Sequence, residues 1–180
     1  MPHRQSLPRL WLLSDARNDA VLEASLAALP PGSGFVFRHY HLGAEARRAR
    51  FAALGAVAEA PGHLSILSGP PELARQWGAD GFYAPAGAAG QPDLLTLATA
   101  HDAREIELAN GAGADGVFLS PVFPTRSHRG AAALGPEAFH RLAALAEMPA
   151  IALGGMNAAR ARELGWPRWA GIDGLSVPIG

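Results

Sequence analysis

The chain has 180 residues, of which 49% are hydrophobic and 17% are charged, and these values predict one globular domain, residues 1–180, with its own core. Its formal net charge of −1 provides no broad basic field, so we expect no nucleic-acid partner. The chain has no cysteine, and all 15 of its Lys+Arg residues are arginine, which excludes disulfides, thiolate chemistry and lysine Schiff bases.

The N-terminal residues lack an apolar signal core, and no run approaches the roughly 18 apolar residues of a membrane span. These features predict a cytoplasmic protein without a membrane partner. The densest basic cluster, Arg47, Arg48 and Arg50, falls on a predicted helix. We expect these arginines to form a solvated face, since the overall charge is nearly neutral.

Eight short apolar runs predict β-strands. In chain order they occupy residues 10–13, 35–37, 64–67, 81–83, 94–98, 117–119, 150–153 and 175–177. Helical stretches with recognisable ends follow most of them, at residues 20–29, 71–77, 103–110, 137–146 and 158–164. Asp102 and Asn157 are expected N-cap residues, and Gly78 and Gly165 are expected to end helices.

Continuously apolar strands are typical of parallel sheets covered on both faces. Eight strand–helix units therefore predict an α/β fold, a small (β/α)8 TIM barrel, with a doubly wound sheet as the alternative. A barrel of 180 residues is short, since about 200 is the usual lower end. We expect the chain to fit a barrel into this length because residues 84–90 are too weak a segment for a full helix and no helix follows the last strand.

The pattern Gly-x-Asp-Gly occurs three times, at residues 78–81, 113–116 and 171–174, each time before a short apolar run. Each copy is interpreted as a helix exit that leads into a strand. Asp80, Asp115 and Asp173 would then lie at strand entrances, opposite the catalytic mouth, and hold turns together.

In a parallel barrel the carboxyl ends of the strands carry the functional site. The candidate residues at these ends are Arg38, Tyr40, Ser68, Tyr83, Thr99, Thr125, Ser127, His128, Gly154 and Gly155. Arg38 ends an apolar strand, where an unpaired guanidinium is costly to bury, so it should meet a carboxylate such as Asp15 or a phosphate.

Gly154 and Gly155 separate a strand from an Asn-capped helix, so they either present backbone N–H groups to a phosphate or form a tight turn with positive φ. His128 lies among hydroxyl side chains and is the better candidate for proton transfer, whereas His101 beside Asp102 is expected to cap or pack. His39 and His41 alternate along an extended segment, and no carboxylate spacing supports a metal role for them.

These residues resemble the thiamine phosphate synthase family, including its thiazole tautomerase relatives, over nearly the whole chain. The most specific match is Gly113-Ala-Asp followed by Pro121-Val-Phe-Pro-Thr-Arg-Ser127, with Leu134-Gly135 and Ile151-Ala-Leu-Gly-Gly155 downstream. Arg38 matches the first residue of the family's Arg-x-Lys, and Thr99-Ala-His101 matches its Ser-x-His.

The resemblance implies a (β/α)8 barrel in which a hydroxymethylpyrimidine diphosphate ionises and a thiazole phosphate captures the cation, while magnesium holds the diphosphate. It implies that Arg38, Thr99 and the loop from Thr125 to His128 meet the diphosphate and substrates. Gly154, Gly155 and the end of the last strand would hold the thiazole phosphate. Arg38 and His128 are the candidate catalytic residues, and the other candidates bind substrate.

Several positions depart from the family pattern. Ser68-Gly69-Pro70 replaces Asn-Asp-Arg, Ala88 replaces the second magnesium aspartate, His128 replaces a lysine, and Pro121 replaces the tautomerase histidine. We therefore expect no protein metal site, with magnesium entering only with a substrate diphosphate, and weak synthase activity. The alternatives are a thiazole-type tautomerase or isomerase, or a non-catalytic barrel for a small phosphorylated heteroaromatic ligand. A homodimer is also predicted.

Overall fold

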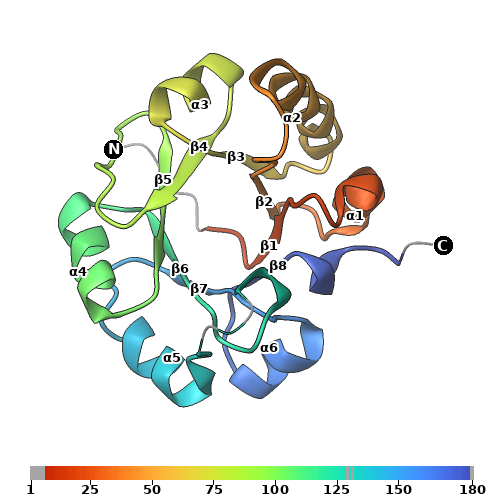
Figure 1. The fold of residues 1–180 in the computed structure, drawn as a ribbon. Coiled ribbons are helices and arrows are strands. Elements are labelled where there is room, and N and C mark those ends of the chain that lie inside the picture. Colours follow the sequence, from red (N-terminus) through yellow and green to blue (C-terminus); the bar gives the residue numbers. More distant parts are fainter. Residues whose placement is uncertain (1–6, 129, 131, 179–180) are drawn as a thin grey trace.

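The computed structural model describes residues 7–128, 130 and 132–178, which contain a closed barrel of eight parallel strands (Figure 1). The strands are β1 (Leu10–Leu13), β2 (Gly34–Phe37), β3 (Leu64–Ser68), β4 (Gly81–Pro85), β5 (Leu95–Ala100), β6 (Gly116–Leu119), β7 (Ala150–Ala152) and β8 (Trp169–Gly171). Each strand pairs with the next in chain order, and β8 pairs with β1, for example through Leu10 and Trp169. The small (β/α)8 barrel is confirmed, and the doubly wound sheet is wrong.

The helices surround the strands as an outer ring (Figure 1). They are α1 (Leu22–Ala28), α2 (Ala44–Glu59), α3 (Pro71–Trp77), α4 (Ala103–Ala112), α5 (Gly135–Ala143) and α6 (Ala158–Leu164), with the short 3-10 turns η1 (Asp19–Val21), η2 (Arg126–His128) and η3 (Asp173–Leu175). The predicted economies hold in the described residues, since β4 and β5 are joined without a helix and only η3 follows β8. None of the described helices has the length and apolar character needed to cross a bilayer.

Side chains alternate between the inside and the outside of the barrel, as the two-residue period of a strand requires. Trp11, Leu13 and Val36 belong to the interior cluster, whereas Leu12 packs in an outer cluster between strands and helices. Trp11 is fully buried and pairs in register with Gly34, where an added Cβ would lie 2.1 Å from the indole ring. The glycine therefore makes room for the large ring inside the barrel.

The prediction of the eighth strand at residues 175–177 is wrong. The eighth strand of the barrel is β8, Trp169–Gly171, and its pairing with β1 closes the barrel. Leu175 instead ends η3 and packs, partly buried, against the outer cluster formed by the first four strands and their helices. The apolar run was misleading because its side chain covers the outside of the barrel rather than pairing with a neighbouring strand.

The three Gly-x-Asp-Gly copies therefore differ. Asp80 and Asp115 lie at strand entrances as predicted, where each carboxylate accepts a backbone N–H of the preceding strand's entrance, from Ser65 at 2.7 Å and Thr96 at 2.9 Å. Asp173 follows β8 and lies at the opposite, carboxyl end of the barrel. The predicted position of Asp173 at a strand entrance, opposite the mouth, is wrong because the strand precedes this copy of the motif.

Candidate functional site

A cavity of about 250 Å³ opens at the carboxyl ends of the strands. Among the predicted site residues, the structure brings to it Arg38, Tyr40, Tyr83, Thr99, Thr125, Ser127, Gly154 and Gly155. The cavity also contains residues outside that set, chiefly Arg17, His101, Ser120, Met156 and Asp173. Its size is near the lower end of small-molecule sites, which suits one compact ligand.

Arg38 follows the last residue of β2 and is 21% exposed at its side chain. Its Nη2 lies 4.0 Å from Oδ2 of Asp15, the outer limit of an ion pair, and its guanidinium carbon lies 5.5 Å from the centre of the Tyr40 ring. Among the described residues the Arg38 guanidinium donates no hydrogen bond. A largely buried cation at the cavity therefore keeps its donors available for a ligand.

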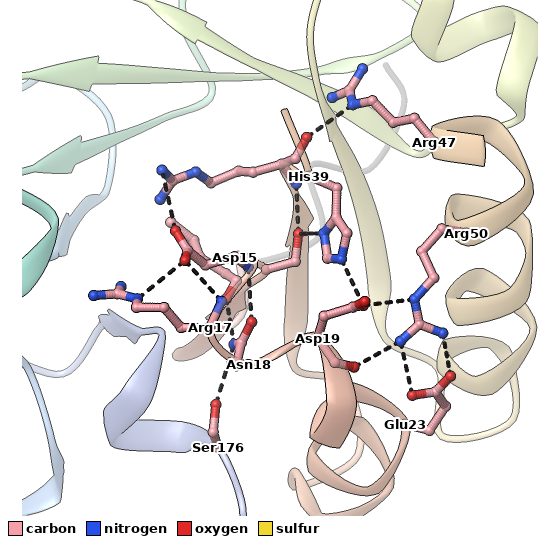
Figure 2. A network of polar contacts seen from close by, with 12 residues as sticks. Asp15, Arg17, Asn18, Asp19, Glu23, His39, Arg47, Arg50 and Ser176 are labelled. Atoms are coloured by element: carbon pink, nitrogen blue, oxygen red, sulfur yellow. Dashed lines mark hydrogen bonds and ion pairs between the residues drawn. The ribbon is translucent and has the colours of Figure 1, made fainter. Parts of the chain in front are cut away.

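The backbone around Arg38 is fixed by Arg47 of α2. Arg47 Nε donates to the Arg38 carbonyl at 2.9 Å, and Arg47 Nη2 donates to the Ser68 carbonyl at 2.6 Å, so it joins the ends of β2 and β3. The expectation of a solvated arginine face is wrong for Arg47 and Arg50, which are partly buried in polar contacts (Figure 2), while Arg48 is exposed. Burial lowers the pKa of Arg47 below its usual range.

Tyr40 and Ser68 are hydrogen-bonded to each other, but only Tyr40 lines the cavity. Tyr40 is 64% exposed and lines the cavity, and its hydroxyl hydrogen-bonds the Ser68 hydroxyl. Ser68, predicted to contact substrate, is buried and does not line the cavity. The structure places it behind Tyr40 because Ser68 is still part of β3, rather than the loop that follows.

Tyr83 and His101 bring polar groups to the cavity from β4 and from the loop after β5. The Tyr83 ring packs edge-on against Phe118 at 5.2 Å between centres, and burial raises the pKa of Tyr83, so its hydroxyl remains a donor. His101 Nδ1 lies 2.7 Å from the Ser120 carbonyl oxygen. Since a carbonyl only accepts, Nδ1 carries the proton, and Nε2 of the neutral ring is left as an acceptor.

His101 was predicted to cap or pack, and the capping part is wrong. Asp102 caps α4 by accepting the Glu105 N–H at 2.9 Å, and the Glu105 carboxylate accepts the His101 N–H at 2.6 Å. Other groups therefore satisfy the helix end, and the imidazole faces the cavity. The position of His101 directly after β5 was the signal that could have placed its side chain at the cavity.

The loop after β6 contributes hydroxyl groups from Thr125 and Ser127. Ser127 Oγ accepts a hydrogen bond from Arg17 Nη2 at 3.0 Å, which links the loops after β1 and β6 across the mouth. The backbone of His128 ends η2, but its side chain lies outside the described part of the structure. The proposed catalytic role of His128 therefore stays a prediction.

Gly154 and Gly155 have φ values of 100° and 61°, which favour glycine. An added Cβ would lie 2.6 Å from Cα of Pro121 at position 154 and 2.5 Å from the Pro124 carbonyl at position 155. The tight-turn interpretation is thus correct for both. Their N–H groups find no acceptor among the described residues, so the same turn leaves two donors beside the cavity.

The charged side chains nearest the cavity are those of Arg17, Arg38, Asp15 and Asp173. Arg17 Nε lies 3.1 Å from Asp15 Oδ1, and Arg17 Nη1 lies 3.7 Å from Asp173 Oδ2. Both carboxylates therefore face cations already held by the protein. This pairing disfavours a protein-held magnesium at the cavity.

A family model described as thiamine monophosphate synthase matches residues 10–178. A bifunctional thiamine biosynthesis protein, ThiM/ThiE, of Symbiobacterium thermophilum is 30% identical over 189 residues, which cover 99% of this chain and 39% of that protein. A thiamine-phosphate synthase of Pyrococcus furiosus is 31% identical over 86 residues, 48% of this chain and 40% of that protein. The matches thus span about two fifths of these relatives' length.

Among solved structures, a thiamine phosphate pyrophosphorylase from Pyrococcus furiosus superposes with a TM-score of 0.78. The match covers 94% of this chain and 87% of that chain at 20% sequence identity. An identity this low speaks for the fold alone, and it agrees with the barrel described above.

Proposed function

This chain belongs to the thiamine monophosphate synthase family, and from that premise we propose that its mouth cavity binds a phosphorylated heteroaromatic compound of thiamine biosynthesis, either a thiazole phosphate or a pyrimidine diphosphate. The observation that carries the proposal is Arg38, a largely buried guanidinium at the cavity that donates no hydrogen bond to any described residue. A phosphate group would satisfy it with charge-assisted hydrogen bonds.

The cavity offers further donors around the same ligand. Thr125 and Ser127 supply hydroxyls from the loop after β6, and Gly154 and Gly155 supply unpaired N–H groups from the loop after β7. Backbone N–H groups that converge in a turn are suited to phosphate oxygens. The Tyr83 ring, which lines the cavity and is held by its contact with the buried Phe118 ring, provides an aromatic surface for a flat heterocycle.

We expect little synthase turnover. The positions where the family pattern has magnesium aspartates are occupied by Gly69, after β3, and Ala88, after β4. The two carboxylates that remain near the cavity, Asp15 and Asp173, face Arg17. Magnesium would then enter only with a substrate diphosphate, and charge on the leaving group would be less stabilised than with two protein ligands.

His101 supports an isomerase as the second candidate. Its Nδ1–H is directed to the Ser120 carbonyl, so Nε2 is available as a base at the cavity. Nε2 would take a proton from one ring position of the ligand and return it to another, which changes neither the composition nor the oxidation state. Incubation of a thiazole phosphate in D2O should then exchange a ring-bound hydrogen, and His101→Ala should abolish that exchange. Exchange lost in His128→Ala instead would assign the base to His128.

The primary test is a thermal-shift panel with thiazole phosphate, pyrimidine diphosphate, pyrophosphate and thiamine phosphate, each with and without magnesium. Ligand at 100 times its Kd stabilises the folded state by about 2.7 kcal/mol. For a domain of this size that corresponds to a rise in Tm of about 5–10 °C.

We expect a shift with a phosphorylated heterocycle that does not require magnesium. Absence of a shift with all four compounds would contradict the binding proposal. Binding without turnover would favour the non-catalytic barrel, whereas thiamine phosphate production at an ordinary synthase rate would contradict the expected loss of activity.

A further inference from the structure

Two imidazoles and a carboxylate converge beside the mouth, outside the cavity described above. Asp19 lies in η1, His39 and His41 lie in the loop after β2, and one ligand atom from each lies within 4.8 Å of the other two. The centres of the two imidazole rings are 5.0 Å apart. We propose that Asp19, His39 and His41 form a binding site for a divalent transition-metal ion such as Zn²⁺.

His39 is held in one orientation (Figure 2). Its side chain is fully buried, its ring stacks on Phe37 at 4.7 Å, and its φ of 38° is rare for a residue other than glycine. Nδ1 lies 2.8 Å from Ser14 Oγ, which leaves Nε2 directed at Asp19. Histidine ligands of metals commonly have their second ring nitrogen fixed by such a partner.

Asp19 is also oriented by a neighbour. Its Oδ1 accepts a hydrogen bond from Arg50 Nε at 2.8 Å, and Arg50 in turn pairs with Glu23 (Figure 2). Carboxylates that bind metals are commonly hydrogen-bonded in this way. Asp19 and Glu23 together carry one negative charge more than Arg50 supplies, so the local charge still favours a cation.

Binding of an ion requires a change of tautomer at His39. For Nε2 to bind an ion, the proton of the neutral ring moves to Nδ1, which can then donate to Ser14 Oγ.

The geometry requires two movements. Ligand atoms around a tetrahedral zinc ion lie about 3.3–3.5 Å apart, whereas the three ligand atoms here lie within 4.8 Å of one another, and His39 Nε2 lies only 2.7 Å from Asp19 Oδ1. His41 is exposed and can approach by side-chain rotation, and Asp19 must give up its hydrogen bond to the His39 ring so that both atoms can face the ion. Two imidazoles and a carboxylate suit zinc, cobalt or nickel better than magnesium, and three protein ligands leave a fourth position for water.

Such an ion would stabilise the loop that carries Arg38. Ser14 Oγ accepts the Arg38 N–H at 2.7 Å and contacts His39 Nδ1 at the same time, so the ion site and the cavity share one support. The metal proposal does not rest on the proposed function, since none of its three ligands lines the cavity.

The test is calorimetric titration of chelator-treated protein with Zn²⁺, together with absorption spectra of the Co²⁺ complex. We expect one ion per chain, at least roughly tenfold weaker binding in His41→Ala and in Asp19→Asn, and about 10- to 100-fold weaker binding in Ser14→Ala, which leaves all three ligands in place but removes the hydroxyl that orients His39. His41 is exposed, so its variant should fold normally.

His101→Ala is the matched control, because it removes an imidazole at the cavity and should leave Zn²⁺ affinity unchanged. Absence of Zn²⁺ binding would overturn the proposal. Binding that is unchanged in both His41→Ala and Asp19→Asn, or that is lost only in His101→Ala, would place the ion elsewhere and overturn it as well.

Discussion

The two sides of the barrel mouth are stabilised by different kinds of contact. The segments that follow β1 and β2, including helix α2, carry charged side chains that contact one another, such as Arg17 with Asp15 and Arg50 with Asp19 (Figure 2). The loops after β7 and β8 present glycines whose backbone lies against other backbone, such as Gly154 on Pro121 and Gly174 on the Met156 carbonyl. We call these the polar side and the glycine side.

The difference predicts two kinds of failure. On the polar side, a substitution removes a charge or a hydrogen bond while the neighbouring arginines and acids can compensate, so ligand affinity should change more than stability. On the glycine side, any side chain meets main-chain atoms that cannot rotate away, so folding stability should change first. The substitutions below test this division, from the largest expected effect to the smallest.

Gly154→Ala should produce the largest loss of stability. The new Cβ would lie 2.6 Å from Cα of Pro121, at a φ of 100° that side chains rarely adopt. Strained backbone and overpacking each cost about 1–3 kcal/mol, so we expect about 3 kcal/mol off the free energy of unfolding, measured by urea denaturation.

Gly111→Ala is the matched control for that prediction. Gly111 lies within α4, and an added Cβ has nothing within 4 Å outside the helix. Alanine should stabilise the chain there by about 0.5–1 kcal/mol. If the two variants had equal stability, the steric account of the glycine side would be wrong.

Arg38→Gln should mainly change affinity. Its guanidinium donates no hydrogen bond to described residues, and its ion pair with Asp15 is at 4.0 Å, so stability should fall by less than about 1 kcal/mol. Loss of charged hydrogen bonds to a bound phosphate costs about 1.5–3 kcal/mol, or roughly 10- to 150-fold in Kd. Calorimetry with the compound that gives the largest thermal shift measures this, and Arg48→Gln, on the exposed face of α2, is the control. Equal affinities in the two variants would contradict the role of Arg38.

The pH dependence of stability tests how the polar side is fixed. Burial lowers the pKa of His39 below its ordinary value of 6.5. Between 6.5 and the folded-state pKa the unfolded chain binds a proton that the folded chain does not, so the free energy of unfolding falls as pH is lowered through this window. The slope due to one group is at most about 1.4 kcal/mol per pH unit.

His39→Gln should remove that contribution to the slope. Urea denaturation at several values from about pH 7.5 to about 5.5 isolates it as the difference between variant and wild type. Asp19 also has a lowered pKa, but its contribution is lost only at more acidic pH, below its ordinary 3.8. An identical slope in the two proteins would show that His39 is not held neutral by burial.

The sequence predicted the fold well where the pattern is local. Seven of the eight strands overlap the predicted runs, and Asp102 and Asn157 cap their helices by accepting N–H groups of Glu105 and Arg160. The eighth strand was missed because Trp169–Gly171 is short and is defined by pairing with β1, at the far end of the chain. Hydrophobic periodicity contains no information about such a partner.

The site was predictable where a residue directly follows a strand, as with Arg38 and Thr99. Arg17 was missed because it lies four residues beyond β1 and is held at the mouth by contacts with Ser127 and Asp173, which are distant in sequence. Asp19 was missed as a neighbour of His39 and His41 for the same reason. Contacts between residues distant in sequence, rather than spacing within a motif, place these side chains.

The smallest expected effect belongs to Asp173, the residue where the two sides meet. Its carboxylate follows β8 on the glycine side but lies 3.7 Å from Arg17 on the polar side, and it is 52% exposed. Asp173→Asn removes a negative charge beside the cavity, so a phosphorylated ligand should bind more tightly, by about 0.2–1 kcal/mol or roughly 1.4- to 5-fold. Asp80→Asn, which changes the same motif position at the opposite end of the barrel, should leave affinity unchanged and lower stability through its hydrogen bond to the Ser65 N–H. If Asp173→Asn instead weakened binding, Asp173 would serve to position Arg17 for the ligand, and its charge would matter less than its place in the polar side.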